Sequence, residues 1–268
     1  MRGGRHIFEL NNVYHMDCVE GMRQLPDDFV DLTVTSPPYD DLRKYNGYSF
    51  DFENVARELY RITKPGGVLV WVVGDKTKSG SETLTSFKQS IFLKEECGIL
   101  GHDTMIYRKT NPIPLTHNRY EQEFEFMFVF SKGKPKTFNP LMVPCSTAGQ
   151  KYDYSKRQSA ATFEQNGAGR NRNEILITKD VKQKGNIWSY TVGNNKSTRD
   201  KIAFQHPAIF PEQLATDHIV SWSNESDLVF DPMCGSGTTL KMAKQLNRQF
   251  LGFDISGEYV AITKQRII

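Results

Sequence analysis

Residues 228–239 read Leu228-Val229-Phe230-Asp231-Pro232-Met233-Cys234-Gly235-Ser236-Gly237-Thr238-Thr239. The segment predicts a short apolar strand, a tight turn and the start of a helix. Glycines in such a turn let the backbone reverse sharply and let a ligand approach main-chain N–H groups. A second strand over residues 250–254 follows the helix and ends at Asp254, 23 residues after Asp231. A carboxylate at that place is positioned to accept hydrogen bonds from ribose hydroxyls, which predicts a nucleoside site.

The details of the turn narrow the class of ligand. Position 240 is leucine, so the dinucleotide pattern G-x-G-x-x-G is absent, and the lysine of a phosphate-binding P-loop is also absent. An aspartate at the strand end would repel a pyrophosphate, whereas S-adenosylmethionine carries positive charge and no phosphate. The alternative is an ordinary strand-to-helix turn, which a lone G-x-G would favour. The expected cofactor-binding residues here are Asp231, Pro232, Met233, Cys234, Gly235, Ser236, Gly237, Thr238 and Asp254.

Strand and helix signals alternate on both sides of an irregular middle segment, which predicts an α/β fold with a mostly parallel sheet. Proline at position 211 suits the first turn of a helix. The predicted strands and helices comprise strands at 29–35, 68–73 and 124–130, helices at 52–62 and 84–100, and, after Pro211, a strand at 228–231, a helix at 238–246, a strand at 250–254 and a helix at 259–266.

The segment Thr35-Ser36-Pro37-Pro38-Tyr39 directly follows a buried strand. Ligand sites of open α/β sheets lie beyond the carboxyl ends of strands, and consecutive prolines fix the backbone and contribute no N–H donors. The Ser36 hydroxyl and the Pro37 carbonyl could hold the two protons of an exocyclic base amine and aim its lone pair at a methyl donor. Tyr39 offers a flat face for an extruded base. The alternative is a proline-terminated strand with a surface tyrosine.

Positive charge is concentrated in the middle of the chain. The net charge is only +3, but residues 131–201 hold 14 basic and 5 acidic residues. A polyanion would be attracted to that segment, although a solvated loop would also explain a charge run. Structureless loops of this length are uncommon in compact domains, so a functional insertion is expected.

The remaining composition excludes several classes of protein. The four cysteines are scattered, without metal-ligand or disulfide-framework spacing, so no metal is expected. No apolar run approaches the roughly 20 residues of a membrane span, and no apolar signal core follows the basic start. A reduced, cytoplasmic setting is therefore expected.

The two motifs together resemble the amino-group DNA methyltransferases that modify N6 of adenine or N4 of cytosine. The catalytic motif precedes the glycine turn, an order that is similar to the β class of the family. The resemblance covers nearly the whole chain. It implies a Rossmann-like S-adenosylmethionine-dependent methyltransferase fold in permuted order with an inserted target-recognition region. The implied organisation is a catalytic half at 1–133, an insertion at 134–201 and a cofactor-binding half at 202–268.

Further segments are similar to family elements. His15-Met16-Asp17-Cys18, expected ahead of the first strand, resembles the segment whose Asp lies near the cofactor, and His206-Pro207 resembles the contact to its methionine end. Two positions depart from the family pattern: Met233 replaces a phenylalanine, and Asp254 replaces the usual ribose-binding glutamate. Double-stranded DNA is the implied partner, and a second copy of the chain and a restriction endonuclease are further candidates. The expected DNA contacts in the insertion are Arg170, Arg172, Lys182, Lys184 and Lys196.

Several alternatives stay open. In the family, a serine at the position of Ser36 is found mostly in enzymes that methylate N4 of cytosine, so N4 of cytosine is favoured over N6 of adenine. A methyltransferase acting on RNA or on a protein glutamine is a competing hypothesis, although the glutamine enzymes carry their motif after the glycine turn. A catalytically inactive DNA-binding protein on the same scaffold is another, and the intact Ser36, Pro37, Tyr39 and Asp231 argue against it. A dehydrogenase lacks its nicotinamide fingerprint.

Overall fold

A computed structural model describes residues 8–38, 50–112, 114, 118–153 and 175–268. The chain divides into two compact units. The larger unit comprises Met1–Asn139 and Asn186–Ile268, and the smaller unit comprises Pro140–Gly185.

The larger unit is built on an eight-stranded sheet with the order β1-β14-β13-β2-β3-β7-β6-β12. The pairs β1/β14, β14/β13, β13/β2, β2/β3 and β6/β12 are parallel, whereas β7 runs antiparallel to β3 and β6. The sheet is therefore mostly parallel, as the sequence predicts. The strands span Asn12–His15 (β1), Val30–Thr35 (β2), Thr63–Val73 (β3), Leu100–Lys109 (β6), Phe124–Ser131 (β7), Ile187–Tyr190 (β12), Leu228–Asp231 (β13) and Gln249–Asp254 (β14).

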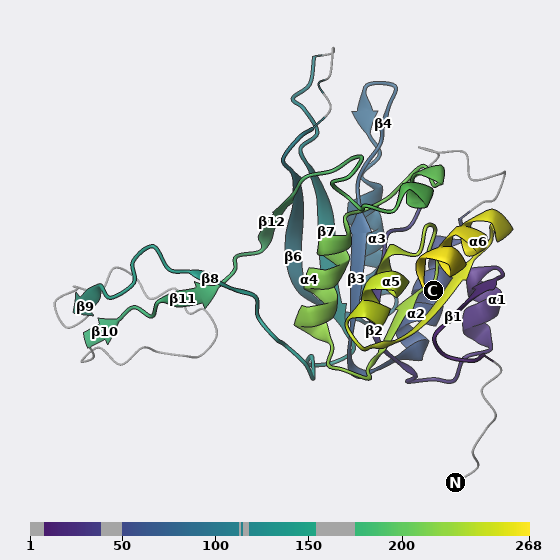
Figure 1. Ribbon diagram of the computed structural model, residues 1–268, viewed down its shortest axis with the longest axis horizontal. Coiled ribbons are helices and arrows are strands. Elements are labelled where there is room, and N and C mark those ends of the chain that lie inside the picture. The colour runs from purple at the N-terminus through teal and green to yellow at the C-terminus, as the bar shows by residue number, and fades with distance from the viewer. Residues whose placement is uncertain (1–7, 39–49, 113, 115–117, 154–174) are drawn as a thin grey trace, which may run out of the picture. The chain divides into compact units, whose positions relative to one another are not determined.

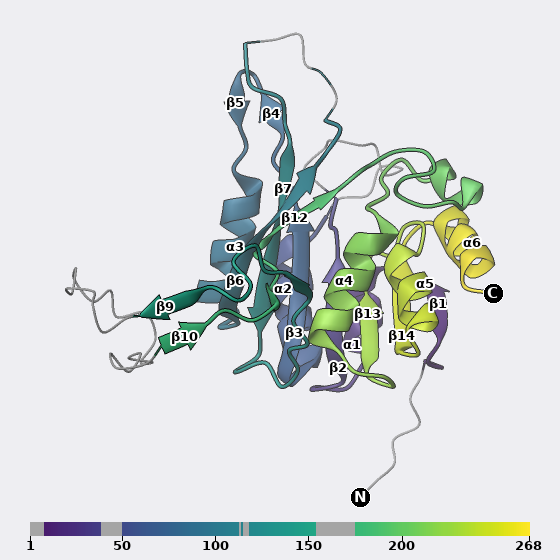
Figure 2. The ribbon, with the colours of Figure 1, turned by 60° about the vertical axis from the view of Figure 1, so that its left-hand side comes forward.

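Helices cover both faces of this sheet (Figures 1 and 2). One layer contains α1 (Cys18–Arg23), α2 (Phe52–Ile62) and α3 (Thr85–Glu95), in which α2 contacts both neighbours. The other layer contains α4 (Glu212–Trp222), α5 (Thr238–Gln245) and α6 (Gly257–Arg266), in which α5 contacts both neighbours. A short 3-10 helix, η3 (Lys201–Gln205), precedes α4, and a small hairpin of β4 (Thr77–Lys78) and β5 (Ser81–Glu82) follows β3.

The pattern of burial explains these elements. Every residue of β2 is buried, as expected for a central strand covered on both faces. The helix α2 buries Val55, Leu59 and Ile62, which recur at helical spacing, and Asp51 caps its first turn. Trp71 of β3, one of the largest fully buried side chains, packs against α2.

Two segments differ from the sequence-based expectation. The strand expected at 68–73 begins earlier, because α2 ends at Ile62 and Thr63 already pairs with Val30 as the start of β3. The His15–Cys18 segment begins on the last residue of β1 and leads into α1, so it follows the first strand rather than preceding it. β1 has four residues, and among the described strands it pairs only with β14 from the other end of the chain, so its local pattern is weak.

The smaller unit is a two-stranded antiparallel ribbon. β8 (Met142–Pro144) pairs with β11 (Val181–Gln183), and β9 (Lys151–Asp153) pairs with β10 (Ile175–Ile177). Backbone hydrogen bonds between the two pairs, such as Cys145 N–H to the Asp180 carbonyl at 2.8 Å, continue the ribbon. The strands β9 and β10 lead to and from residues 154–174, which lie outside the described part of the chain.

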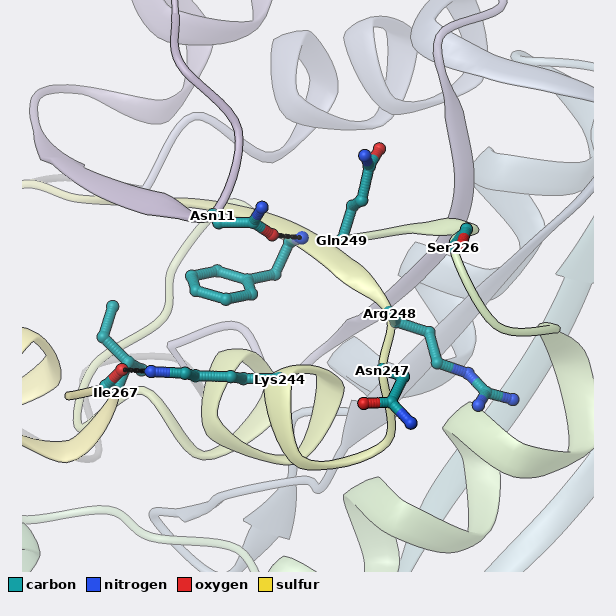
Figure 3. Close-up of a pocket in the computed structure, with 8 residues that line it drawn as sticks. Asn11, Ser226, Lys244, Asn247, Arg248, Gln249 and Ile267 are labelled. Carbon is teal, nitrogen blue, oxygen red and sulfur yellow. Dashed lines mark hydrogen bonds between the residues drawn. The ribbon is translucent and has the colours of Figure 1, made fainter.

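A surface pocket lies beside the amino-terminal end of β14 (Figure 3). Asn11 accepts a hydrogen bond from the Phe250 N–H at 3.2 Å, and Lys244 donates to the Ile267 carbonyl at 2.6 Å. The first bond joins the start of β14 to the residue before β1, and the second joins α5 to the end of α6. Because the predicted site lies at the opposite, carboxyl ends of the strands, this pocket is separate from it. Among the described helices, none is long and apolar enough to span a membrane.

Candidate active site

The two sequence motifs meet at the carboxyl ends of neighbouring parallel strands. β2 ends at Thr35 and leads into Ser36, and β13 ends at Asp231 and leads into the glycine turn. The next strand, β14, ends at Asp254, opposite His15 of β1. Residues that are almost 200 positions apart in the chain are thereby brought to one edge of the sheet, where open α/β folds bind their ligands.

Asp231 is the most deeply buried carboxylate at this edge. Its side chain is 2% exposed, and Oδ1 accepts hydrogen bonds from the Thr35 hydroxyl at 2.7 Å and from the Met233 N–H at 3.2 Å. Burial raises the pKa of Asp231 to about 7, the hydrogen bonds oppose that rise, and the nearby charge of Asp254 adds to it. The negative charge of Asp231 is thus poorly compensated, and a cation bound here would stabilise it.

The glycine turn requires glycine at two positions. Gly235 and Gly237 have φ angles of +51° and +78°, in the left-handed region. A Cβ at Gly235 would lie 2.8 Å from the His206 ring, and a Cβ at Gly237 would lie 2.5 Å from Thr263. Both close approaches would force neighbouring side chains to move. The turn is therefore packed tightly from behind, and Met233 is its only residue from Pro232 to Thr238 that is partly exposed.

Asp254 holds two turns together. Its Oδ2 accepts from the Gly235 N–H at 2.7 Å, and its Oδ1 accepts from the Ser256 N–H at 2.8 Å. Burial raises the pKa of this carboxyl above its usual value, while the two backbone hydrogen bonds lower it. Each oxygen retains acceptor capacity for a ribose hydroxyl, since a carboxylate has about four lone-pair sites.

The predicted Asp17 lies beside Asp254. The Met16 N–H donates to the Asp254 carbonyl at 3.0 Å, so the turn after β1 adjoins the end of β14. The Asp17 carboxylate caps α1 by accepting from the N–H groups of Val19 and Glu20 at 2.9 and 3.1 Å. Capping is therefore its observed role, in addition to the cofactor contact that the resemblance implies.

His206 lies against the glycine turn, whereas Pro207 is exposed. The His206 ring is 8% exposed and makes an edge contact with Tyr259, at a centroid distance of 4.3 Å. The Ala208 N–H donates to Nδ1 at 3.1 Å, which orients the ring. The structure thus brings His206 to the predicted cofactor turn from a separate segment of the chain.

The catalytic motif leaves the sheet next to Asp231. Pro37 is buried and Ser36 and Pro38 are half-buried, as expected for a segment at the rim of a site. Tyr39, the fourth predicted catalytic residue, lies outside the described residues. Among the residues that are described, no group of three His, Cys, Asp or Glu side chains is placed to hold a metal ion.

The arrangement fits S-adenosylmethionine. Two buried carboxylates with raised pKa values, a turn with two left-handed glycines and an adjoining aromatic ring offer acidic and main-chain contacts to a cationic nucleoside. A phosphate-bearing cofactor would be repelled by the same carboxylates.

Comparison with known families decides the class of protein. The model of a DNA methylase family, the N6/N4 methylases, matches residues 30–265. The chain belongs to this DNA methylase family. It is 55% identical over 238 residues to the orphan methyltransferase M.BamHII of Bacillus amyloliquefaciens, which covers 89% of this chain and 88% of the relative. It is 27% identical over 264 residues to the Type II methyltransferase M.BglII of Bacillus subtilis, covering 96% and 68% of the two chains.

Solved structures show the same fold. A PvuII DNA methyltransferase described as cytosine-N4-specific superposes with a TM-score of 0.67 at 20% identity, over 96% of this chain and 86% of that chain. The M1.HpyAVI–SAM complex superposes with a TM-score of 0.60 at 22% identity, over 95% and 97% of the two chains. The DNA methylase described here is thus a Rossmann-like, S-adenosylmethionine-dependent methyltransferase.

Arg266 is a residue of this methylase that the sequence motifs did not reveal. Its side chain is 1% exposed and forms ion pairs with Asp200 at 2.9 Å and Glu212 at 2.7 Å. The same guanidinium donates to the Ser236 carbonyl of the glycine turn at 2.5 Å. Lys241 pairs with both acids at 2.7 Å. In the sequence alone, Arg266 resembles any basic residue at a helix end.

The predicted DNA-binding residues are divided between the two units. Lys182 and Lys184 lie in the ribbon unit, where Lys182 is exposed and Lys184 is half-buried. Lys196 is exposed in a turn of the larger unit. Arg170 and Arg172 lie outside the described residues.

Proposed function

We propose that this methylase transfers a methyl group from S-adenosylmethionine to the exocyclic amino group of a flipped base in double-stranded DNA, with N4 of cytosine favoured. The observation that carries the proposal is the adjacency of the Ser36-Pro37-Pro38 segment to Asp231 at the carboxyl edge of the sheet, through the 2.7 Å hydrogen bond from Thr35. The acceptor-holding segment and the cofactor turn are thereby neighbours.

The proposed roles follow from the chemistry of an exocyclic amine. Its lone pair is delocalised into the ring, so the nitrogen must be turned toward tetrahedral geometry before it can attack. Ser36 Oγ and the Pro37 carbonyl are the acceptors that hold the two amino protons, and Tyr39 stacks on the extruded base. The bound cofactor supplies an electrophilic methyl group on a sulfonium.

The proposed cofactor contacts are of two kinds, electrostatic contacts and close steric contacts with the main chain. Asp231 and Asp254 supply negative charge near the cationic cofactor, and Asp254 is the acceptor for its ribose hydroxyls. The turn from Pro232 to Thr238 supplies close main-chain approach, with His206 and Pro207 at the methionine end and Asp17 beside Asp254. In support, Asp17, His206 and Asp254 lie around the same turn.

Target recognition is assigned to the insertion between residues 134 and 201, and above all to its ribbon. A two-stranded β-ribbon fits the major groove of DNA, and the described ribbon exposes Lys151, Lys179 and Lys182. Lys182→Ala should weaken DNA binding at all sequences and lower the slope of log affinity against log salt by about 0.9 if the residue contacts one phosphate. An unchanged salt slope would remove Lys182 from the interface.

Ser36 is the basis for favouring cytosine. The experiment is methylation of unmethylated duplex DNA with S-adenosylmethionine, followed by digestion to nucleosides and mass spectrometry. N4-methylcytosine supports the full proposal, and N6-methyladenine keeps the enzyme class while showing that Ser36 does not decide the base. If neither product forms on duplex DNA while the cofactor binds, the substrate proposal is wrong, and RNA is the next substrate to test.

A further inference from the structure

The backbone pairing between the two motif-bearing strands stops before either motif begins. β13 and β2 are in register only at Val229 with Leu32 and at Phe230 with Thr33. Beyond that point β2 continues its pairing with β3, up to Thr35 opposite Trp71. The ends of β2 and β13 therefore come together without a backbone ladder, although the site needs them at a defined separation.

Two threonine hydroxyls span this interval instead. The Thr35 hydroxyl donates to Asp231 Oδ1 at 2.7 Å, and the Thr239 hydroxyl at the start of α5 donates to the Val34 carbonyl at 3.0 Å. Thr35 and Thr239 are both fully buried, and Asp231 is 2% exposed. Hydrogen bonds to an ionised group in a dry environment are short and directional, so the bond from Thr35 constrains the strand ends more than a surface contact would.

Resting on the function proposed above, we propose that Thr35 is a positioning residue for methyl transfer. Its hydroxyl, bound to Asp231, holds the Ser36-Pro37-Pro38 segment in register with the cofactor turn where the backbone ladder between the two strands has ended. Thr35 touches neither substrate nor cofactor in this role. It acts through Asp231 on one side and through the peptide bond to Ser36 on the other.

The chain contains a closely matched control. Thr33 lies two residues earlier on β2, on the same side of the strand, and is also fully buried. Within the described structure the Thr33 hydroxyl has no hydrogen-bond partner. Threonine-to-valine substitution at either position keeps the shape and removes one hydroxyl. Thr33→Val therefore measures the cost of the substitution itself, and Thr35→Val adds the loss of the bond to Asp231.

The kinetic test compares Thr35→Val, Thr35→Ser and Thr33→Val. Because a misplacement of about 1 Å can cost about 100-fold in rate, Thr35→Val should lower kcat by about 10- to 100-fold, with a smaller change in KM for S-adenosylmethionine. Thr35→Ser keeps the hydroxyl and should restore most of the activity, and Thr33→Val should behave as the wild type. Equal kcat values for Thr35→Val and Thr33→Val, or no rescue by serine, would overturn the proposal.

A second measurement does not depend on catalysis. The groups that face Asp231 are the hydroxyls of Thr35 and Thr239, the Met233 N–H, Asp254 from β14 and the thiol of Cys234 in the turn. The bond from Thr35 lowers the pKa of Asp231, so its removal should raise that pKa. Titration of the ¹³C-labelled carboxyl by NMR, assigned with Asp231→Asn, should show a higher midpoint in Thr35→Val and the wild-type midpoint in Thr33→Val. An unchanged midpoint in Thr35→Val would overturn the proposed role of the hydrogen bond from Thr35 to Asp231.

These outcomes test the hydrogen bond between Thr35 and Asp231 separately from the proposed function. A wild type that methylates no DNA would refute the proposed function, and the NMR titration would still test the contact between Thr35 and Asp231. If Thr35→Val does not fold, Thr35→Cys replaces the hydroxyl with a weaker donor of similar size. The kcat of Thr35→Cys should then lie between the kcat of Thr35→Ser and complete loss of activity. A wild-type kcat in Thr35→Cys would contradict the proposal.

Discussion

The guanidinium of Arg266, on the last turn of α6, donates to the Ser236 carbonyl in the glycine turn at 2.5 Å. The same side chain neutralises Asp200, which precedes η3, and Glu212, which begins α4. Burial would raise the pKa of Asp200, but hydrogen bonds from Lys241 and Arg266 outweigh it and hold the pKa below its usual value. Arg266 thus joins the chain's final helix to the back of the cofactor turn.

Arg266→Met should destabilise the methylase by about 1–3 kcal/mol, because the substitution removes the buried donor to the Ser236 carbonyl and leaves Lys241 alone to neutralise Asp200 and Glu212. Urea denaturation measures the change. Lys264→Met, on the exposed side of the same helix, is the control and should change stability by less than about 0.5 kcal/mol. Equal stability of the two variants would show that the Arg266 cluster contributes little.

Gly237→Ala should destabilise the enzyme and weaken cofactor binding. Its φ of +78° costs an alanine about 1–2 kcal/mol, and the new Cβ would lie 2.5 Å from Thr263. Gly80 has a φ of +79° with no atom within 4 Å of a built Cβ, so Gly80→Ala isolates the backbone cost. Thermal unfolding and calorimetric titration with S-adenosylmethionine should show the larger loss for Gly237→Ala. Similar losses in both variants would exclude the close approach as a cause.

Asp254→Ala should weaken S-adenosylmethionine binding while leaving DNA binding mostly intact. The substitution removes the acceptor of the Gly235 and Ser256 N–H groups and the proposed ribose contact together. Asp254→Asn keeps one acceptor oxygen and should lose less affinity. Calorimetry gives the cofactor Kd, and fluorescence anisotropy with labelled duplex gives the DNA Kd. Unchanged cofactor affinity in Asp254→Ala would remove Asp254 from the site.

Cofactor affinity should depend on pH through Asp231. Burial raises the pKa of this carboxyl in the folded protein from 3.8 to about 7. Below that pH the carboxyl is neutral, so affinity for the cationic cofactor should fall by up to about tenfold per pH unit as one proton is bound. The stability of the cofactor-free protein should depend on pH in the opposite sense. A carboxyl whose pKa is raised in the folded state stabilises the folded protein at low pH, and this stabilisation is lost as the pH rises from about 4 to 7. Calorimetric titrations between pH 5.5 and 8.5 measure the first effect. Asp231→Asn should flatten the profile, and an unaltered profile would assign it to another group.

Tyr39→Ala should lower turnover far more than it lowers cofactor affinity, because stacking on an extruded base is needed only once DNA is bound. Single-turnover methylation of duplex DNA and calorimetry with S-adenosylmethionine measure the two quantities. Tyr39→Phe retains the ring and is the matched control. An equal fall in rate and in cofactor affinity would contradict the stacking role.

Local patterns predicted most of the elements. The continuous apolar run at 68–73 lies within β3, and the helical spacing at 52–62 coincides with α2. β12 was not predicted because its four residues lie within the irregular segment 134–201, although it belongs to the eight-stranded sheet. Short edge strands such as β1 and β12 owe their conformation to distant partners, so their own sequences contain little signal.

The two motifs, their order and the class of chemistry can be predicted from local sequence, because glycine, proline and carboxylate positions impose local geometry wherever they occur. The hydrogen bond from Thr35 to Asp231, the support of Ser236 by Arg266 and the packing of His206 on Gly235 depend on the three-dimensional fold. Each of these contacts joins segments that are far apart in the chain. Their partners are set by strand order and helix packing, which no local pattern of residues specifies.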